Sequence, residues 1–393
     1  MMRPGRAWWL CAAASALTGC VERAPTADVT TVDSAGIRIV TSPVPTRVDT
    51  IGPDPVWRVV ATPTDDAPLL FDVGDLVAMA SGGVAVANAG THQVVAIDAE
   101  GRERWRFGRR GDGPGEFTGS ISLAAVGDTV VAFDFITRRL VWIAPDGMLG
   151  AVRRLDLPDP NLVLVGGRPD GTLVFRARHL LGPAEGINRD SVVYLAVGAD
   201  GTRLGEIGWS RQGNVDLVMG EYGPNIHDQA FGPTGMATLL GSGVVHADGD
   251  RAEVIRRDDS GVITQMLRWH EEPVAVTADD REHFAAERRA MAADAFQRRQ
   301  LDEWLDRATW SATKPVTGLL VGRSDGVLLV AGTCEAAAEG CTWREFDATG
   351  QLRRRLWLPV VPSDALVAGD LLVTVTSDAL GVERLEGWRL PAP

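Results

Sequence analysis

Apolar and polar residues alternate over short stretches along most of the chain after residue 33. In the first clear group such stretches cover 76–79, 84–87, 94–98 and 104–107, and Gly- or Asp-containing turns separate them. Alternation with a period of two predicts β-strands, and the Gly/Asp clusters predict tight connections. The group therefore predicts one unit of four antiparallel strands.

Similar groups follow along the rest of the chain. Internal repeats of about 40–50 residues with four strands each are typical of propeller blades. The sequence therefore predicts an all-β fold, a six-bladed β-propeller with four-stranded antiparallel blades over 33–393. The later groups begin at Ile121, Leu162, Met236, Gly318 and Leu366.

The sixth group lacks a fourth strand before the chain stops at Pro393. A ring of blades leaves an open sheet edge unless the two ends of the chain pair. We therefore expect an N-terminal strand to close the ring. Two stretches alternate suitably, 36–40 and 56–59, and the sequence analysis favours the first.

Two stretches interrupt the repeats. Residues 209–233 are rich in Gly and Asn, which predicts a long loop. Residues 277–310 have no strand alternation, and Leu301, Trp304 and Leu305 fall on one helical face. We predict one long or two short helices, inserted between the fourth and fifth blades.

The N-terminus has the features of a targeting segment. Arg3 precedes an apolar run over 7–17 that is too short to span a bilayer permanently. The following Leu-Thr-Gly-Cys at 17–20 resembles the lipobox of bacterial lipoproteins; the alternative is a plain secretory signal. The resemblance implies a signal peptide over 1–20, acylation of Cys20, membrane anchoring and a tether over 21–32. Val21 then favours the outer membrane, facing the periplasm or the cell surface.

Charge and cysteine content narrow the picture further. The net charge of −13 argues against a nucleic-acid partner, since phosphate binding needs a basic field. Outside the N-terminal segment only Cys334 and Cys341 remain. An exported protein meets an oxidising compartment, so the two predict a local disulfide worth about 2–3 kcal/mol.

Residues 108–117 read Gly-Arg-Arg-Gly-Asp-Gly-Pro-Gly-Glu-Phe. This loop resembles one in bacterial six-bladed propellers related to NHL repeats, within the broad TolB-like group. Residues 33–40, Asp-Ser-Ala-Gly-Ile-Arg-Ile-Val, resemble the start of such lipoproteins. The resemblance implies the fold and not an activity, because NHL-type propellers generally bind partners while some relatives are enzymes.

Long connections on one face of a rigid scaffold are where function concentrates. We therefore expect a non-catalytic binding or scaffold module, without a cofactor, whose loop-rich face meets a protein or polysaccharide of the envelope. The candidate residues on this face are Arg109, Arg110, Asp112, Glu116, Phe117, Arg138, Arg139, Tyr222, Asn225 and His227.

The alternative is a metal-dependent hydrolase or lactonase with its site at the mouth of the channel. Hard cations such as calcium need several converging oxygen ligands. The strands predicted to line the channel carry almost no acids or amides. Asp75, Asn161 and Asp228 are the weak candidate ligands, at strand entrances. The Gly-x-Ser-x-Gly match at 322–326 is followed by a strand and not by the helix of a nucleophile elbow.

The lipobox generates a first test. Replacing Cys20→Ser removes the acylated residue, so the mature protein should move from the membrane fraction to the soluble fraction on ultracentrifugation. Cys11→Ser, within the predicted signal peptide, is the matched control and should leave the distribution unchanged. A Cys20→Ser protein that still sediments with membranes would contradict lipid anchoring.

Overall fold

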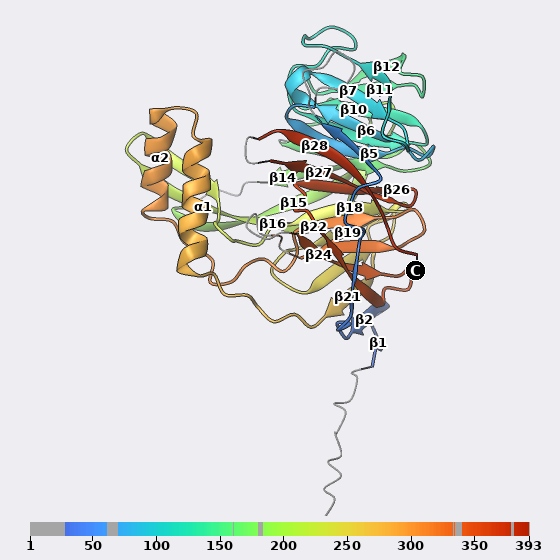
Figure 1. The fold of residues 1–393 in the computed structure, drawn as a ribbon. Coiled ribbons are helices and arrows are strands. Elements are labelled where there is room, and N and C mark those ends of the chain that lie inside the picture. Colours follow the sequence, from blue (N-terminus) through green and yellow to red (C-terminus); the bar gives the residue numbers. More distant parts are fainter. Residues whose placement is uncertain are drawn as a thin grey trace, which may run out of the picture.

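The computed structural model describes residues 28–60, 70–159, 161–179, 184–332, 334, 340–378 and 381–392. The predicted signal peptide, with the lipobox-like residues 17–20 and Cys20, lies outside these residues. The described chain forms six β-sheets and two α-helices (Figure 1). Within these ranges neither helix is long and apolar enough to cross a membrane.

The first two sheets are plain four-stranded antiparallel units, and the alternating pattern places their strands correctly. A 3₁₀ turn, Ala89–Thr91, joins the second and third strands of the first sheet. The first sheet contains β5 (Val73–Ala78), β6 (Val84–Asn88), β7 (Gln93–Ile97) and β8 (Glu103–Phe107). The second contains β9 (Ile121–Val126), β10 (Thr129–Asp134), β11 (Arg139–Ile143) and β12 (Leu149–Arg154).

The third sheet has five strands, and two of them are long. The predicted loop over 209–233 is wrong: most of this stretch continues β16 and forms β17, which pair as a hairpin. The strands form here despite the Gly-rich composition, because tertiary contacts bury Val215, Leu217 and Val218. The strands are β13 (Leu162–Gly167), β14 (Leu173–His179), β15 (Gly186–Val197), β16 (Arg203–Gly220) and β17 (Gly223–Asp228).

The last three sheets each combine consecutive strands with strands from the N-terminal segment. The fourth contains β18 (Met236–Leu240), β19 (Gly243–Ala247), β20 (Glu253–Arg257) and β21 (Ile263–Trp269), with β1 (Thr30–Ser34) and β2 (Ile37–Ser42) at its edge. The fifth contains β22 (Leu319–Gly322), β23 (Leu328–Ala331), β24 (Cys341–Phe346), β25 (Leu352–Leu358) and β3 (Val48–Thr50). The sixth contains β26 (Asp364–Ala368), β27 (Leu371–Ser377), β28 (Glu383–Arg389) and β4 (Trp57–Val60).

The N-terminal strand that pairs with β28 is β4, antiparallel, and not the favoured stretch 36–40. That stretch lies in β2, which runs parallel to β21 at the outer edge of the fourth sheet. Both stretches alternate, so alternation could not separate them. The contacts of β4 explain why it, and not the stretch 36–40, pairs with β28. Arg58 Nε lies 2.5 Å from the buried carboxylate of Glu386, and Trp57 packs where Gly101 and Gly387 leave room for its ring.

The innermost strands β5, β9, β13, β18, β22 and β26 contact one another in succession, and β26 also contacts β5. Buried apolar side chains fill the space between neighbouring sheets. One such cluster joins Val86 and Ile97 of the first sheet to Val373 and Leu385 of the sixth. The prediction of an all-β fold built from repeated four-stranded antiparallel sheets is confirmed.

The two helices, α1 (Ala278–Met291) and α2 (Ala295–Leu305), lie between β21 and β22, in the stretch for which the sequence predicts helix. Thr277 caps α1 through a reciprocal pair of hydrogen bonds with Asp280. The Asp294 carboxylate accepts the backbone N–H of Gln297 at the start of α2. These caps explain why two short polar helices begin where they do.

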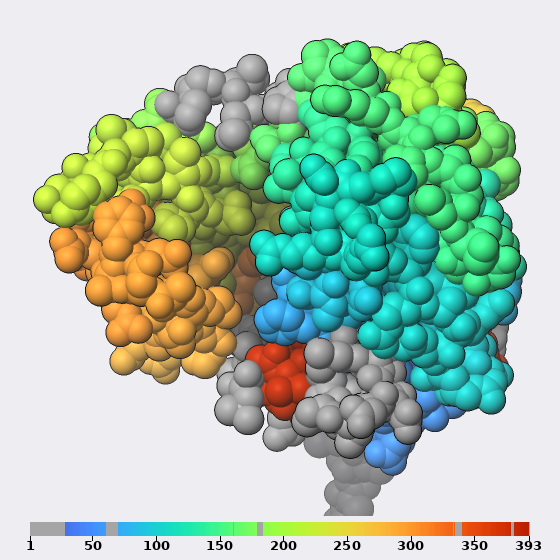
Figure 2. Space-filling model, turned by 90° about the horizontal axis from the view of Figure 1, so that it is seen from above, coloured from blue at the N-terminus to red at the C-terminus, as the bar shows by residue number. Residues whose placement is uncertain are grey.

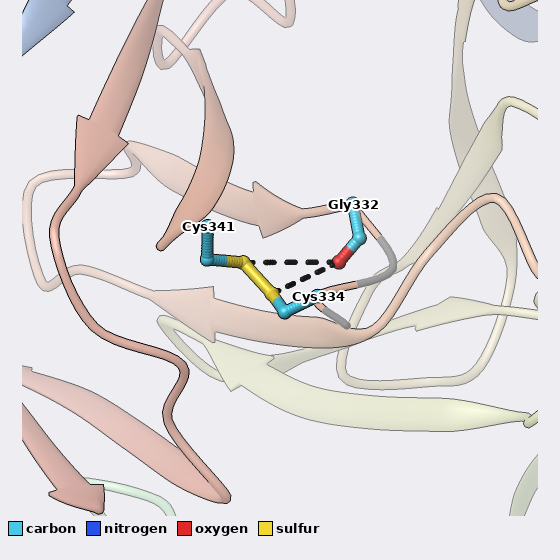
Figure 3. The surroundings of a disulfide bond; sticks show 3 residues. All are labelled: Gly332, Cys334 and Cys341. Atoms are coloured by element: carbon cyan, nitrogen blue, oxygen red, sulfur yellow. Dashed lines mark hydrogen bonds between the residues drawn. A yellow bond between two sulfur atoms is a disulfide. The ribbon is translucent and has the colours of Figure 1, made fainter. Parts of the chain in front are cut away.

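Cys334 and Cys341 form the expected disulfide, with their Cα atoms 5.1 Å apart (Figure 3). Both sulfur atoms lie near the carbonyl oxygen of Gly332, at 3.4 and 4.0 Å. Cys341 is buried at the start of β24. The bridge therefore ties the connection between β23 and β24 to the core of the fifth sheet.

The structural role of β4, which pairs with β28, can be tested by its effect on stability. Trp57 is 9% exposed, and removing so large a buried side chain costs about 3–5 kcal/mol. Trp57→Ala should lower the free energy of unfolding by about this amount in urea denaturation of the mature protein. Val32→Ala on β1, where the side chain is 57% exposed, should change it by less than about 0.5 kcal/mol. Equal effects of the two substitutions would contradict the structural role given to β4.

Candidate functional site

The third sheet and the helical insert together form a projection that we call the arm: residues 215–228 with α1 and α2. Figure 1 shows both helices beside the extended ends of β15 and β16, and Figure 2 shows them packed against neighbouring residues of the third sheet. Val218, Leu301, Trp304 and Leu305 are buried together at this contact. The helices bury one face on the protein's own hairpin, so the arm has a core of its own.

A cavity of about 480 Å³ lies between β17 and the helices, and we call it the arm groove. Its wall combines apolar side chains with amides and two ionisable groups. Clefts of this size with a few polar groups are the usual form of binding sites. The lining residues are Pro224, Asn225, Ile226, His227, Arg288, Met291, Ala292, Gln297, Gln300 and Leu301.

Two sequence-predicted residues lie in the arm groove. Asn225 is buried, and its Nδ2 donates to the carbonyl oxygen of Gln300 at 3.3 Å. His227 stacks on Trp304 with ring centroids 4.3 Å apart. Burial, and then the nearby Arg288 charge, lowers the pKa of His227, so the imidazole is neutral at pH 7. Arg288 is then the one charged group among the lining residues.

The rim of the arm groove is unusually apolar for a surface. Tyr222, the third predicted residue found here, is 52% exposed and meets Phe296 edge to face at 5.3 Å. Arg299 donates from Nη1 to the Tyr222 hydroxyl at 3.3 Å. Contiguous exposed apolar side chains mark interaction surfaces. The exposed apolar residues of the rim are Met219, Tyr222, Ile226, Met291 and Phe296.

The Gly-rich loop over 108–117 is held by its own side chains. The Glu116 carboxylate accepts the backbone N–H of Gly113 at 2.8 Å and pairs with Arg109 at 2.7 Å. These two contacts, the backbone bond first, hold the pKa of Glu116 below its usual value. Phe117 is fully buried against the core between the first two sheets. The motif therefore has a structural role at the seam.

The remaining predicted arginines fix neighbouring backbone. Arg139 donates to the carbonyl oxygens of Gly113 and Glu116, at 3.1 and 3.2 Å, and to that of Asp112. Arg138 donates to the carbonyl oxygens of residues 157 and 159.

Arg110 and Asp112 are exposed at the tip of the loop. In the part of the chain that the structure describes, no hydrogen bond, ion pair or ring contact joins this loop to the arm.

The candidate metal ligands lie on separate elements. Asp75 is on β5, and its two carboxylate oxygens accept the N–H groups of Leu76 and Leu123 at 2.8 and 2.7 Å. Asn161 precedes β13, and Asp228 ends β17 in the arm. Among the described residues, no group of three or more His, Cys, Asp or Glu side chains is placed to hold a metal ion.

A second carboxyl group on an innermost strand, Asp364 on β26, acts on the candidate residue Asp75 and was not predicted from the sequence. Burial raises the pKa of Asp75 to about 7, with the charge of Asp364 on the neighbouring β26 as a further cause. Burial likewise raises the pKa of Asp364 to about 6. Asp364 was overlooked because the sixth repeat was taken to begin at Leu366. The groove-lining Arg288 and Met291 were missed too, although an exposed Met beside Arg residues was a usable signal.

No family model and no curated protein matches this sequence. Among solved structures, a protein of Bacteroides fragilis described as exported has a TM-score of 0.51 at 12% identity, covering 90% of this chain and all of that one. A member of the DUF4221 family from Bacteroides vulgatus has a TM-score of 0.50 at 8% identity, covering 88% and 100%. Virginiamycin B lyase from Staphylococcus aureus has a TM-score of 0.41 at 12% identity, covering 85% of this chain and 99% of that one. A score this low supports no inference. At these identities the similarity shows the fold alone, and the sheet arrangement is that of a β-propeller.

The paired carboxyl groups generate a pH test. Both folded-state pKa values lie above the unfolded value near 3.9, so the stability they contribute is present at low pH and is lost as pH rises toward 7. Asp364→Asn keeps an oxygen for the Ala365 N–H and removes one charge. Its melting temperature should exceed that of the parent at pH 8, by the equivalent of about 2 kcal/mol, and match it at pH 4. Asp54→Asn, at an exposed position, is the control; a gain that does not depend on pH would contradict the assignment.

Proposed function

We propose that the protein is a six-bladed β-propeller, closed by β4 against β28, that is exported, lipid-anchored through Cys20, and acts as a non-catalytic binding module of the bacterial envelope. The arm groove and its apolar rim are the binding surface. The observation that carries the proposal is an apolar, aromatic rim around a cavity with a single charged lining residue, Arg288.

The chemistry of the arm groove defines the partner. Exposed Met291 and Phe296 offer apolar contact, while Gln297 and Gln300 offer hydrogen bonds. Arg288 adds a positive charge, and a guanidinium favours a carboxylate in bidentate geometry. A protein segment that presents an apolar side chain beside an acidic one satisfies all of these groups. A polysaccharide has no comparable apolar side chain to place against the rim.

Export and anchoring are supported by the N-terminal segment and by the disulfide. Disulfides persist in oxidising compartments, and Cys334 and Cys341 are bonded. The similar protein from Bacteroides fragilis is described as exported, which agrees with this placement. The hydrolase alternative has less support, because its candidate ligand Asp228 lies in the arm while Asp75 lies on an innermost strand.

The test is site-specific photo-crosslinking in intact cells. A photoreactive amino acid in place of Met291, which is 74% exposed, should yield one discrete protein adduct of the anchored chain. Arg288→Glu should lower the adduct about tenfold, the change expected for a cost of about 1.4 kcal/mol. Arg251→Glu, a charge reversal outside the arm in the connection between β19 and β20, should leave the adduct unchanged.

Two outcomes would contradict the proposal. One is the absence of any adduct at position 291 while the protein is folded and anchored. The other is an adduct with equal yield in the Arg288→Glu protein. An adduct whose added mass is removed by glycosidases would replace the protein partner with a polysaccharide.

A further inference from the structure

A second cavity, of about 230 Å³, lies where the arm joins the fifth sheet. Its floor is formed by β24 and β25, and the segments that lead to and from the helices cover it. Those segments are joined by an isolated bridge between Ala275 and Thr313. We call the cavity the arginine pocket. The lining residues that matter here are Glu271, Lys314, Gly332, Thr342, Arg344 and Arg355.

Arg344 is buried in this pocket with its hydrogen-bonding capacity only partly used. Its side chain is 7% exposed, and its Nη2 pairs with the Glu271 carboxylate. The guanidinium carbon lies 5.8 Å from the ring centre of Trp269. Nε and Nη1 are buried, and neither has a hydrogen-bond partner among the described residues. Leaving donors of a charged group unpaired in the interior is costly, so the arrangement calls for an acceptor.

A second guanidinium faces the same space. Arg355 lies directly opposite Arg344 in the antiparallel register of β24 and β25. Its Nη2 donates to the carbonyl oxygen of Thr46 at 2.7 Å, while its Nε is buried without a partner among the described residues. Like charges directly opposite each other on adjacent strands destabilise a sheet. An anion between them would remove that cost.

Among the acidic side chains that the structure describes, only Glu271 pairs with one of these two arginines. Glu271 is shared between Arg344 and the Trp269 Nε1–H, which lies 2.9 Å from its carboxylate. The carboxylate of Glu272 is 86% exposed and pairs with His270. Lys314 pairs with Asp280 at 2.8 Å, so these two charges offset each other. Among the described residues, Arg355 therefore has no carboxylate partner, and its one hydrogen bond to the protein is the bond to Thr46.

The wall of the pocket is shaped for close approach. Gly332 donates its N–H to the carbonyl oxygen of Thr342 at 3.0 Å. A Cβ at this position would lie 3.2 Å from Nη1 of Arg344 and would crowd the guanidinium. The disulfide between Cys334 and Cys341 holds this wall in place (Figure 3).

We propose that the arginine pocket binds a small oxyanion, a carboxylate or phosphate group, between Arg344 and Arg355. Guanidinium groups match both in geometry and charge. The arginine pocket and the arm groove have no lining residue in common. The outcome of the crosslinking experiment therefore does not decide the proposal of anion binding, and the reverse also holds.

The test uses the folded mature protein with sodium phosphate and sodium acetate as separate probes. At constant ionic strength, set with sodium chloride, one or both should raise the melting temperature in a saturable way, and calorimetric titration should give a matching dissociation constant. Arg355→Gln should weaken that constant tenfold or more. Arg353→Gln, on the same strand but paired with Asp347 at the surface, should titrate as the parent does.

The relative strength of the two probes assigns the anion class. Arg344→Lys keeps the charge and loses the planar fork, so it should bind more weakly than the parent while still folding, as circular dichroism will report. A melting temperature that follows chloride and the two probes equally would overturn the proposal. So would an Arg355→Gln protein that binds as tightly as the parent.

Discussion

The antiparallel pairing of β4 with β28 is the contact on which the rest of the structure depends. It joins a strand from the beginning of the chain to the last strand of the sixth sheet. The pair is reinforced by Arg58 on the buried Glu386 carboxylate, and the Val73 N–H donates to Glu383 at 2.9 Å to link β28 to the first sheet. Opening this junction would leave the buried Glu386 carboxylate without its Arg58 partner, which is costly. With this junction made, every sheet has a neighbour on both sides.

Sheets that contact one another in succession can support additions at their edges. The third sheet carries such an addition, because the long strand β16 continues to Gly220, pairs there with β17 and packs against α2. The loop at 108–117 is part of the same framework. Phe117 is buried in the core, and Arg139 donates to a carbonyl oxygen of the loop. The arm groove and the arginine pocket are the two surfaces that we propose for recognition.

The sequence predicted the repeated parts of the fold well, because period-two alternation and Gly/Asp turns report directly on local backbone. It failed where tertiary contacts decide. The Gly-rich residues 209–233 became a hairpin because α2 covers Val218. The choice between 36–40 and 56–59 depended on Glu386 and Gly387, which no local pattern reveals. Of the candidate site residues, Asn225 and His227 line the arm groove and Tyr222 lies at its rim. Local patterns could not point to Arg344 and Arg355, because these two meet only through strand register.

Hydrogen–deuterium exchange of the mature protein tests the central claim most directly. Amides that open only on global unfolding exchange far more slowly than those of fraying edges. The account predicts that peptides covering β4 are protected as strongly as those of β27 and β28, while peptides covering the exposed β1 exchange quickly. Exchange in β4 as fast as in β1 would contradict the claim that this strand joins the two ends of the chain.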